Sequence, residues 1–470
     1  MIRTRRLLRY GCFLLLWGEL ACQSPPEETV PPNIVIIYAD DLGYGDLSSY
    51  GGDIPTPNID RIGQAGIRFT DFYVSAPVCT PSRYSLLTGS YPQRSLHGLD
   101  RVIMPGDEHH FDESEVTLAE LLRSQGYRTA ITGKWHLGSA DPSYLPMHQG
   151  FDTFSGHKAG CIDYFHHVYG GMGNFWYVDG KPAEEEGYAT TLITHHAINF
   201  IEQQTKDTTQ PFFLYIPYNA PHFGKTDPDS VPAVTVSLKE GTHLGYKIMN
   251  SLQAPEEYVE RFAHVQDPYR RTYSAMVASL DDQVGRVLDQ LEKAGVADRT
   301  LVWFISDNGG YAETYYGHAS NGALRGEKAS LWEGGIRVPA MVCWPEKIQP
   351  HQVVAQPVCN IDVVPTLGAI VGFADTLTRL PIDGIDVSSV LLEQDTLDRD
   401  IFWQYADQSA FRRGRWKLRN GNELYDLASD LGEKNNVAAT YPERVDELRE
   451  AYQQTAEDLM ISIDSTLRSL

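Results

Sequence analysis

Four polar clusters in this 470-residue chain each follow a strand-like apolar run. The clusters are Asp40-Asp41, Gly133-Lys134-Trp135-His136, Asn219-Ala220-Pro221-His222 and Asp307-Asn308-Gly309-Gly310. Carboxylate and amide oxygens are the hard ligands that Ca²⁺ or Mg²⁺ prefers, and the two aspartate clusters contain no thiol or imidazole that would favour zinc. Lysine and histidine supply positive charge and transferable protons. Together these residue types predict chemistry on an anionic group beside a divalent cation.

A further cluster, Cys79-Thr80-Pro81-Ser82-Arg83, stands shortly before Leu87-Thr88-Gly89. A cysteine on its own is most often a small buried hydrophobe. Pro81 and Ser82, however, favour a helix that starts just after Cys79, so an anion bound there would face free backbone amides and the positive helix end. Arg83 would add a fork-shaped cation one turn later. The segment therefore predicts an anion-binding helix start with a thiol beside it.

The elements that must position these clusters alternate between strands and helices. The strand-like runs are residues 33–39, 127–132, 211–218, 301–306 and 338–344. Between them lie helical patterns, the clearest over residues 273–291, where apolar residues recur every three or four positions before Gly295. This alternation predicts a doubly wound α/β sheet, in which ligands bind beyond the carboxyl ends of the strands. The clusters are thus expected at one rim of the sheet.

Length and a hydrophobic content of 42% predict one large domain and a smaller one. We expect a catalytic domain over residues 33–384 and a C-terminal subdomain over residues 385–470. The strand-like stretches of the subdomain are residues 401–405, 415–418 and 423–426, before a helix that begins near Pro442. They predict a small antiparallel sheet with a helix, packed on the large domain.

Residues 1–22 have the composition of an export signal. Four arginines precede a short apolar run, residues 12–17, and Ala21-Cys22 follows. The run is too short to span a membrane, and no later segment is long and apolar enough to do so. Cys22 after a small residue suggests a bacterial lipoprotein site, and Thr4-Arg5-Arg6 resembles a twin-arginine signal, so lipidation and the export route stay open. We expect an exported protein of the periplasm or outer surface.

The net charge of the chain is −23, and it becomes −26 without the first 22 residues, which hold four arginines and one glutamate. This acidic excess argues against nucleic acid or long polyanions as general partners. An anionic substrate must instead be attracted by a local cluster of cations and metal. With Cys12 and Cys22 in the signal and Cys79 assigned to chemistry, three of the six cysteines remain, so at most one disulfide is expected.

The Cys79 segment resembles the maturation signature of the type I sulfatases, in the alkaline phosphatase superfamily, whose cysteine is oxidised to formylglycine. The resemblance extends over residues 33–436 and includes, in order, the motifs DDLGYGDL, GKWHLG, APH, SDNGG, LRGEKASLWEGGIRVP and LYDLASDLGEKNN. Ser90 is a departure, because many relatives have arginine there. The resemblance implies an alkaline-phosphatase-like fold with a large mixed sheet flanked by helices, sulfate ester hydrolysis, one Ca²⁺ and a formylglycine-generating maturation enzyme as partner.

The resemblance also assigns residues to roles. It implies metal ligands at Asp40, Asp41, Asp307 and Asn308, completed by oxygens of the sulfate and of the formylglycine made from Cys79. It implies that Arg83 positions the formylglycine, that His136 hydrogen-bonds it, that Lys134 and Lys328 bind sulfate oxygens, and that His222 protonates the leaving alcohol, alone or with Lys328. A hydrated aldehyde suits the reaction because one hydroxyl attacks sulfur and the other then loses its proton, so that the carbonyl reforms and sulfate leaves.

The substrate side is predicted from residues 150–181, which are rich in aromatic residues and histidines. Their GFDTFSG opening and the following Asp163-Tyr164 resemble the arylsulfatase B branch, whose members act on sulfated amino sugars. The candidate substrate-binding residues are His166, His167 and, before the LRGEK motif, His318. Residues 223–267 show no regular pattern and are expected to form part of the cleft wall. A compact cluster without a basic track favours a pocket, and hence exo-action on a terminal sulfated sugar.

Two other functions fit parts of this pattern. A phosphomonoesterase or phosphodiesterase of the same superfamily would also use a metal-bound nucleophile and a cationic pocket. Such enzymes would show extra aspartate and histidine ligands for a second metal, whereas Lys134 and Lys328 favour the monoanionic sulfate. The other alternative is a non-catalytic protein that binds sulfated glycans, if Cys79 stays unmodified.

Overall fold

The computed structural model describes residues 31–207 and 209–467. The predicted export signal, with the lipidation candidate Cys22, lies outside the described residues. In the part that is described, none of the helices combines the length and apolarity needed to cross a membrane. The predicted boundary between residues 384 and 385 stays a prediction.

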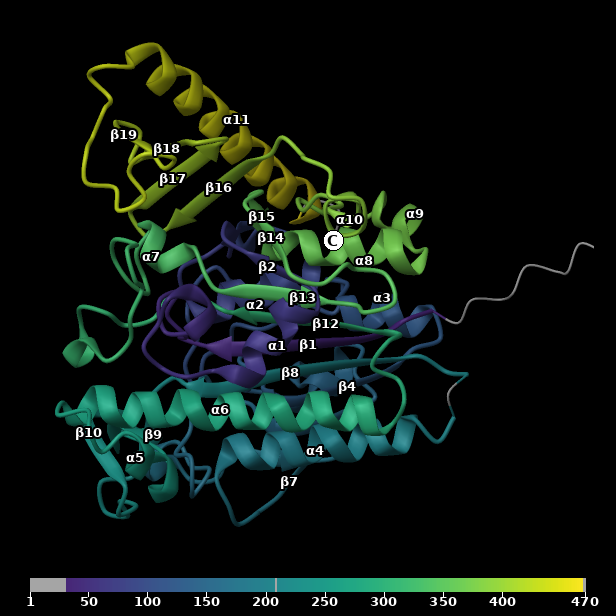
Figure 1. Cartoon of the computed structure of the whole chain (residues 1–470), viewed down its shortest axis with the longest axis vertical. Coiled ribbons are helices and arrows are strands. Elements are labelled where there is room, and N and C mark those ends of the chain that lie inside the picture. Colours follow the sequence, from purple (N-terminus) through teal and green to yellow (C-terminus); the bar gives the residue numbers. More distant parts are fainter. Residues whose placement is uncertain (1–30, 208, 468–470) are drawn as a thin grey trace, which may run out of the picture. The chain divides into compact units, whose positions relative to one another are not determined.

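A ten-stranded mixed sheet runs through the centre of the molecule (Figure 1). Its strand order is β14-β2-β13-β12-β1-β8-β4-β5-β6-β7. The strands are β1 (Asn33–Asp40), β2 (Ile67–Phe69), β4 (Arg128–Lys134), β5 (Thr153–His157), β6 (Trp176–Val178), β7 (Lys181–Pro182), β8 (Phe212–Pro221), β12 (Thr300–Ser306), β13 (Ala340–Cys343) and β14 (Gln352–Val354). Strands β12, β1, β8, β4 and β5 are parallel neighbours. Their carboxyl ends therefore meet at one edge, as predicted for an α/β sheet.

Helices cover both faces of this sheet, which confirms the predicted fold class (Figure 1). The α-helices of the described structure, including α11 of the C-terminal region, are α1 (Pro57–Ala65), α2 (Cys79–Thr88), α3 (Leu118–Ser124), α4 (Ala189–Gln204), α5 (Glu256–Arg261), α6 (Pro268–Lys293), α7 (Glu333–Ile336), α8 (Val363–Val371), α9 (Ala374–Leu377), α10 (Ser388–Leu392) and α11 (Pro442–Leu467). Alternate residues of β1 face the two layers: Val35 and Ile37 belong to the core under α1, α4 and α6, and Ile34 and Ile36 to the core under α2, α3 and α8. Because both faces are covered, β1 is buried throughout.

The C-terminal region forms a four-stranded antiparallel sheet with α11 packed on it. The strands are β16 (Asp400–Tyr405), β17 (Gln408–Arg413), β18 (Trp416–Arg419) and β19 (Glu423–Asp426). Three strands were expected here; β17 has only Ala410 and Phe411 as apolar residues, too few for a periodic signal. Buried Lys417 fastens the sheet to the rest of the molecule, because its ammonium lies 2.9 Å from both Glu333 and Glu433.

Residues 223–267 are not patternless, which corrects the sequence-based expectation. They form a three-stranded antiparallel sheet, in the order β10-β11-β9, followed by α5. The strands are β9 (Gly224–Thr226), β10 (Thr235–His243) and β11 (Tyr246–Gln253). Outside this segment, a separate short parallel pair joins β3 (Phe72–Tyr73) to β15 (Val358–Cys359). Only Leu238 is buried in β10, so the alternation that identifies a half-buried strand is missing from its sequence.

Candidate active site

The four polar clusters meet at the carboxyl edge of the central sheet. Asp40 ends β1, and Lys134 ends β4. Asp307 follows β12, which lies directly beside β1, and the amide of Asp41 donates to an oxygen of Asp307 at 3.1 Å. Asp41 has a left-handed backbone, with φ of 62°, and so has His136, with φ of 58°. Such turns cost roughly 1–3 kcal/mol each and are held by the surrounding structure, which is typical of functional sites.

Three buried carboxylates face three buried cations at this edge. Lys134 lies 2.6 Å from Asp40, Arg83 lies 2.9 Å from Asp307, and Lys328 contacts Asp41. Burial and the neighbouring charge of Asp40 raise the pKa of Asp307 to about 6. The negative charge of Asp40 thus still repels that of Asp307, although each carboxylate has a cationic neighbour. A bound cation would offset this repulsion.

The oxygen atoms of this cluster fit a divalent cation. Within the described part of the chain, Asp40 Oδ1, Asp41 Oδ2 and Asn308 Oδ1 are buried and have no hydrogen-bond partner. Buried polar atoms are rarely left unpaired, and hard oxygens of this kind are what Ca²⁺ or Mg²⁺ binds. Potential ligand atoms of Asp40, Asp41 and His222 all lie within 4.8 Å of one another. His222, which was expected at the same rim of the sheet, therefore stands beside the predicted oxygen ligands.

Cys79 is the first residue of α2, as the Pro81-Ser82 pattern predicts. Its side chain is only 2% exposed, and burial raises the pKa of the thiol. A protonated thiol is a weak nucleophile, so the position suits a residue that is modified before it reacts better than a reactive thiolate. Helix α2 is fixed from both ends: Asn360 donates to the carbonyl oxygen of Ser82 at 2.9 Å, and Gly89 closes the helix with φ of 72°.

His136 and His222 are buried and neutral. Burial, followed by the charge of Lys134, holds the pKa of His136 well below its usual value, and burial does the same for His222 although Asp41 opposes it. His222 Nδ1 lies 2.7 Å from the carbonyl oxygen of Phe223, so that this nitrogen carries the proton and donates. Nε2 of His222, 3.4 Å from Asp41, then offers a lone pair. The ring can give a proton to a leaving group only after it has gained one there.

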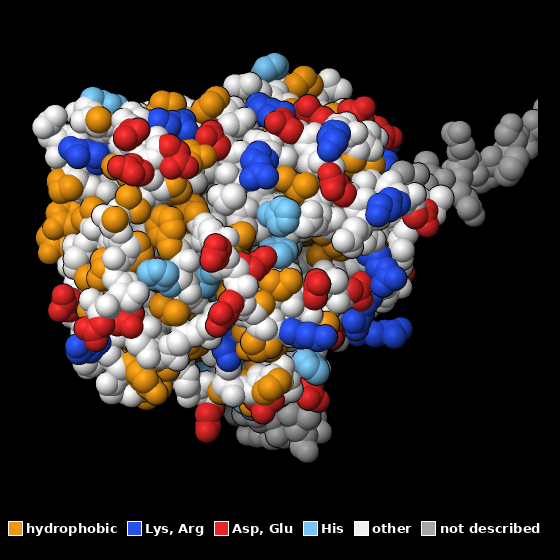
Figure 2. Space-filling view, turned by 90° about the horizontal axis from the view of Figure 1, so that it is seen from below, with side chains coloured by type: hydrophobic (Ala, Val, Ile, Leu, Met, Phe, Trp, Pro, Cys, Tyr) orange, Lys and Arg blue, Asp and Glu red, His pale blue; other side chains and the backbone are white. Residues whose placement is uncertain are grey.

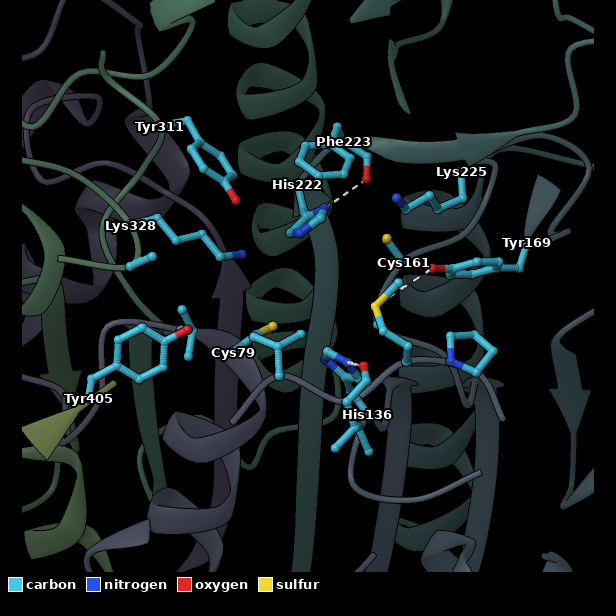
Figure 3. Close-up of a pocket in the computed structure, with 17 residues that line it drawn as sticks. Cys79, His136, Cys161, Tyr169, His222, Phe223, Lys225, Tyr311, Lys328 and Tyr405 are labelled. Carbon is cyan, nitrogen blue, oxygen red and sulfur yellow. Dashed lines mark hydrogen bonds between the residues drawn. The ribbon is translucent and has the colours of Figure 1, made fainter. Parts of the chain in front are cut away.

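A cavity of about 210 Å³ opens beside these groups (Figure 3). Its wall contains the predicted residues Cys79, His136, His222 and Lys328. Arg83, Lys134 and the predicted ligands Asp40, Asp41, Asp307 and Asn308 are buried and are not part of the wall. Tyr169 comes from the aromatic segment predicted for the substrate side, and Phe223 and Lys225 come from the segment expected in the cleft wall. The wall also contains Tyr311, Tyr405 and the segment 102–105, which were not predicted. Lys225 and Tyr311 closely follow predicted motifs, which is a usable signal, whereas Tyr405 comes from the C-terminal sheet and has none.

The three candidate substrate-binding histidines are not among the residues of this wall. His167 stacks on Trp176 and lies 3.1 Å from the carbonyl oxygen of Gly187. His318 lies 2.7 Å from the carbonyl oxygen of Tyr315, and burial lowers its pKa to about 4. The side chain of His166 is 45% exposed, 3.7 Å from Asp163. Their role in substrate binding stays a prediction that the cavity does not support.

No disulfide is formed by Cys79, Cys161, Cys343 and Cys359, all of which are free and buried in the described structure. Cys161 shares the wall of the cavity with Cys79.

Comparisons with known proteins agree with this geometry. Residues 32–373 match the family model described as Sulfatase. The chain is 32% identical to arylsulfatase A of Bos taurus, over 86% of this chain and 77% of the relative, and 33% identical to steryl-sulfatase of Rattus norvegicus, over 82% and 74%. Among solved structures, Ps i-CgsB in complex with k-i-k-neocarrahexaose superposes with a TM-score of 0.79 at 30% identity, covering 90% of this chain and 92% of that one.

Proposed function

Because the chain belongs to the type I sulfatase family of the alkaline phosphatase superfamily and hydrolyses sulfate esters, we propose that it acts on a terminal sulfated sugar with a formylglycine made from Cys79 and one Ca²⁺. One observation carries the proposal: Cys79 stands at the wall of a cavity beside three carboxylates and three cations at one sheet edge. A maturation enzyme of the host would oxidise Cys79, and residues 1–22 would direct export.

When bound, Ca²⁺ would polarise the sulfate group, and the hydrated formylglycine would supply the attacking hydroxyl. Asp40, Asp41, Asp307 and Asn308 would hold the ion, in keeping with their unpaired buried oxygens. Arg83, fixed by Asp307, would keep the formylglycine in position at the helix start. This arrangement keeps the reacting groups in place before the substrate arrives.

Lys134 and Lys328 would neutralise the charge that develops on the sulfate oxygens. Each ammonium already lies beside a carboxylate, Asp40 for Lys134 and Asp41 for Lys328. Although burial opposes its charge, Asp41 raises the pKa of Lys328 well above its usual value, so Lys328 stays charged. Fixed charges of this kind stabilise a transition state without reorganisation.

Two imidazoles would move protons. His136 Nδ1 is buried without a hydrogen-bond partner among the described residues, and the neutral ring can accept a proton from the nucleophile. His222 stands on the cavity wall, between Lys328 and Lys225 in the view of Figure 3. It would take up a proton from solvent at Nε2 and pass it to the leaving alcohol, alone or with Lys328.

We expect His222→Ala to lose at least about 100-fold in kcat on sugar sulfates but less than about tenfold on 4-nitrophenyl sulfate. A sugar alcohol needs a proton to leave, whereas nitrophenolate leaves without one. Steady-state kinetics on both substrates measure the two losses. His318→Ala is the matched control, since His318 is also buried and bonded to a carbonyl oxygen but lies off the cavity wall, and it should affect both substrates alike. Equal losses in His222→Ala would remove His222 from the role of general acid.

The shape of the site supports exo-action. The groups are gathered around one cavity of about 210 Å³, which suits a single sugar unit better than a long chain. On the face shown in Figure 2, basic side chains are interspersed with acidic ones, and the chain as a whole is acidic. The similar structure with a bound neocarrahexaose supports a carbohydrate sulfate as substrate. We propose a terminal N-acetylgalactosamine or galactose sulfate, from a glycosaminoglycan or algal polysaccharide oligosaccharide.

Digestion of size-defined sulfated oligosaccharides tests this proposal. We expect sulfate to be released from the unit at the non-reducing end, with internal sulfates untouched, because only a chain end can enter the cavity. Sequencing of the products by mass spectrometry locates each lost sulfate. Cys79→Ala protein, digested in parallel, identifies release by a contaminating enzyme. Loss from internal units as readily as from the end would contradict the pocket, and absence of release from every sugar would contradict the substrate class.

A further inference from the structure

Lys225 is a cation in the cavity wall, and no carboxylate of the described residues is paired with it. Lys225 and Lys328 are the two lysines of that wall, and they point toward the space between them from opposite sides (Figure 3). Lys328 is neutralised by Asp41. In the part of the chain that the structure describes, Lys225 forms no ion pair, and its ammonium donates to the amide oxygen of Asn250 at 2.6 Å.

The surroundings of Lys225 hold its side chain in place. The residue lies on β9, where it is paired in register with Asn250 of β11. Its ammonium lies 5.8 Å from the ring centre of Tyr169 and 5.4 Å from that of Phe223. Two aromatic faces and one amide oxygen stabilise the charge but do not neutralise it. The ammonium is therefore positioned before a ligand binds, which lowers the entropy cost of binding one.

The charges of the site are already balanced without Lys225. Three carboxylates, those of Asp40, Asp41 and Asp307, face three cations, those of Lys134, Lys328 and Arg83, so the charges of these six groups sum to zero. A divalent cation and the single negative charge of a sulfate ester leave the site positive even before Lys225 is counted. A second positive charge in a half-buried, mostly apolar wall is costly unless an anion faces it. A sulfate monoester alone does not supply that anion.

We propose that Lys225 binds a second anionic group of the substrate, a carboxylate or a second sulfate, on the side of the cavity opposite Lys328. This inference rests on the proposed function and narrows it: the preferred substrate carries at least two negative charges. Tyr169 and Phe223 flank the ammonium, so the second anion is recognised next to an aromatic surface on which the ring of the substrate can lie.

Chromogenic sulfate esters with and without a carboxylate separate this role from catalysis. The substrates are 4-nitrophenyl sulfate and its analogues with a carboxylate at ring position 2 or 3, assayed with wild-type protein and Lys225→Met, whose side chain has a similar length and no charge. We expect kcat/KM of the variant to fall at least about tenfold on the better carboxylated ester, because one charge-assisted hydrogen bond is lost, and less than about threefold on 4-nitrophenyl sulfate, which has no carboxylate. For each ester, the ratio of kcat/KM between wild type and variant removes the effect of the different leaving groups.

The controls identify the cause. Lys225→Arg keeps the charge and should retain most of the preference for the carboxylated ester. Lys247→Met is the matched control, because Lys247 lies on the same sheet, is exposed and pairs with Asp229, and is not part of the wall; it should leave both rates unchanged. Equal losses on both esters, or no loss on either, overturn the proposal for Lys225. If wild-type protein turns over no ester, the proposed function fails, and calorimetric binding of the same esters still decides whether Lys225 selects the carboxylated one.

Discussion

Cys79→Ala should lower turnover of 4-nitrophenyl sulfate by at least about four orders of magnitude while the protein stays folded. The loss is this large because removal of a covalent nucleophile leaves only binding and electrostatic stabilisation. Folding should survive because the substitution removes a single sulfur atom at the first residue of α2, from a side chain that lines a cavity. Kinetics give the loss, and thermal unfolding monitored by circular dichroism should show a shift of only a few degrees.

Cys161→Ala is the matched control for this variant. Cys161 is also buried, also free and also lines the cavity, but no motif assigns it to chemistry. It should keep turnover within about tenfold of wild type, since it loses only packing. Mass analysis of the tryptic peptide that contains Cys79 should find an aldehyde residue in place of the thiol. Comparable turnover by Cys79→Ala, or an unmodified thiol in protein that turns over, would contradict the proposed nucleophile.

Removal of divalent metal should suppress turnover by about a thousandfold or more, and Ca²⁺ should restore it. Without an ion, Asp40 Oδ1, Asp41 Oδ2 and Asn308 Oδ1 are left unpaired in the described structure, and the sulfate loses its main source of positive charge. Exhaustive dialysis against a chelator, followed by titration with Ca²⁺ and, separately, Mg²⁺, measures the effect on kinetics.

A second readout is independent of activity. An ion that binds the folded state alone raises the melting temperature, and the rise grows with the logarithm of the ion concentration once that exceeds Kd. Ca²⁺ should therefore stabilise the wild-type protein and should stabilise Asn308→Ala less, because that variant lacks one ligand oxygen without a change in charge. Asn199→Ala, on α4 and partly exposed, is the control and should respond like wild type. Full activity after demetallation, or a melting temperature that does not change when Ca²⁺ is added, would refute the metal assignment.

The sequence by itself determined the fold class and the location of the candidate catalytic groups. The cores of β1, β4, β8 and β12 are runs of apolar, β-branched or aromatic residues, because both faces of each strand are covered, and such runs can be read locally. Polar residues that directly follow parallel strands must meet at one edge. Asp40, Lys134 and Asp307 could thus be grouped before any contact between them was known.

Only the tertiary structure decided which groups pair and what surrounds the substrate. The ion pair of Lys134 with Asp40 and that of Arg83 with Asp307 join residues far apart in the chain, and nothing in the local sequence of either partner encodes the other. The cavity wall likewise takes Tyr405 from the C-terminal sheet and Lys225 from a small sheet whose outer strand is exposed. Periodicity reports the burial of a residue within its own element, whereas these contacts depend on how distant elements pack, so they appear only in the folded protein.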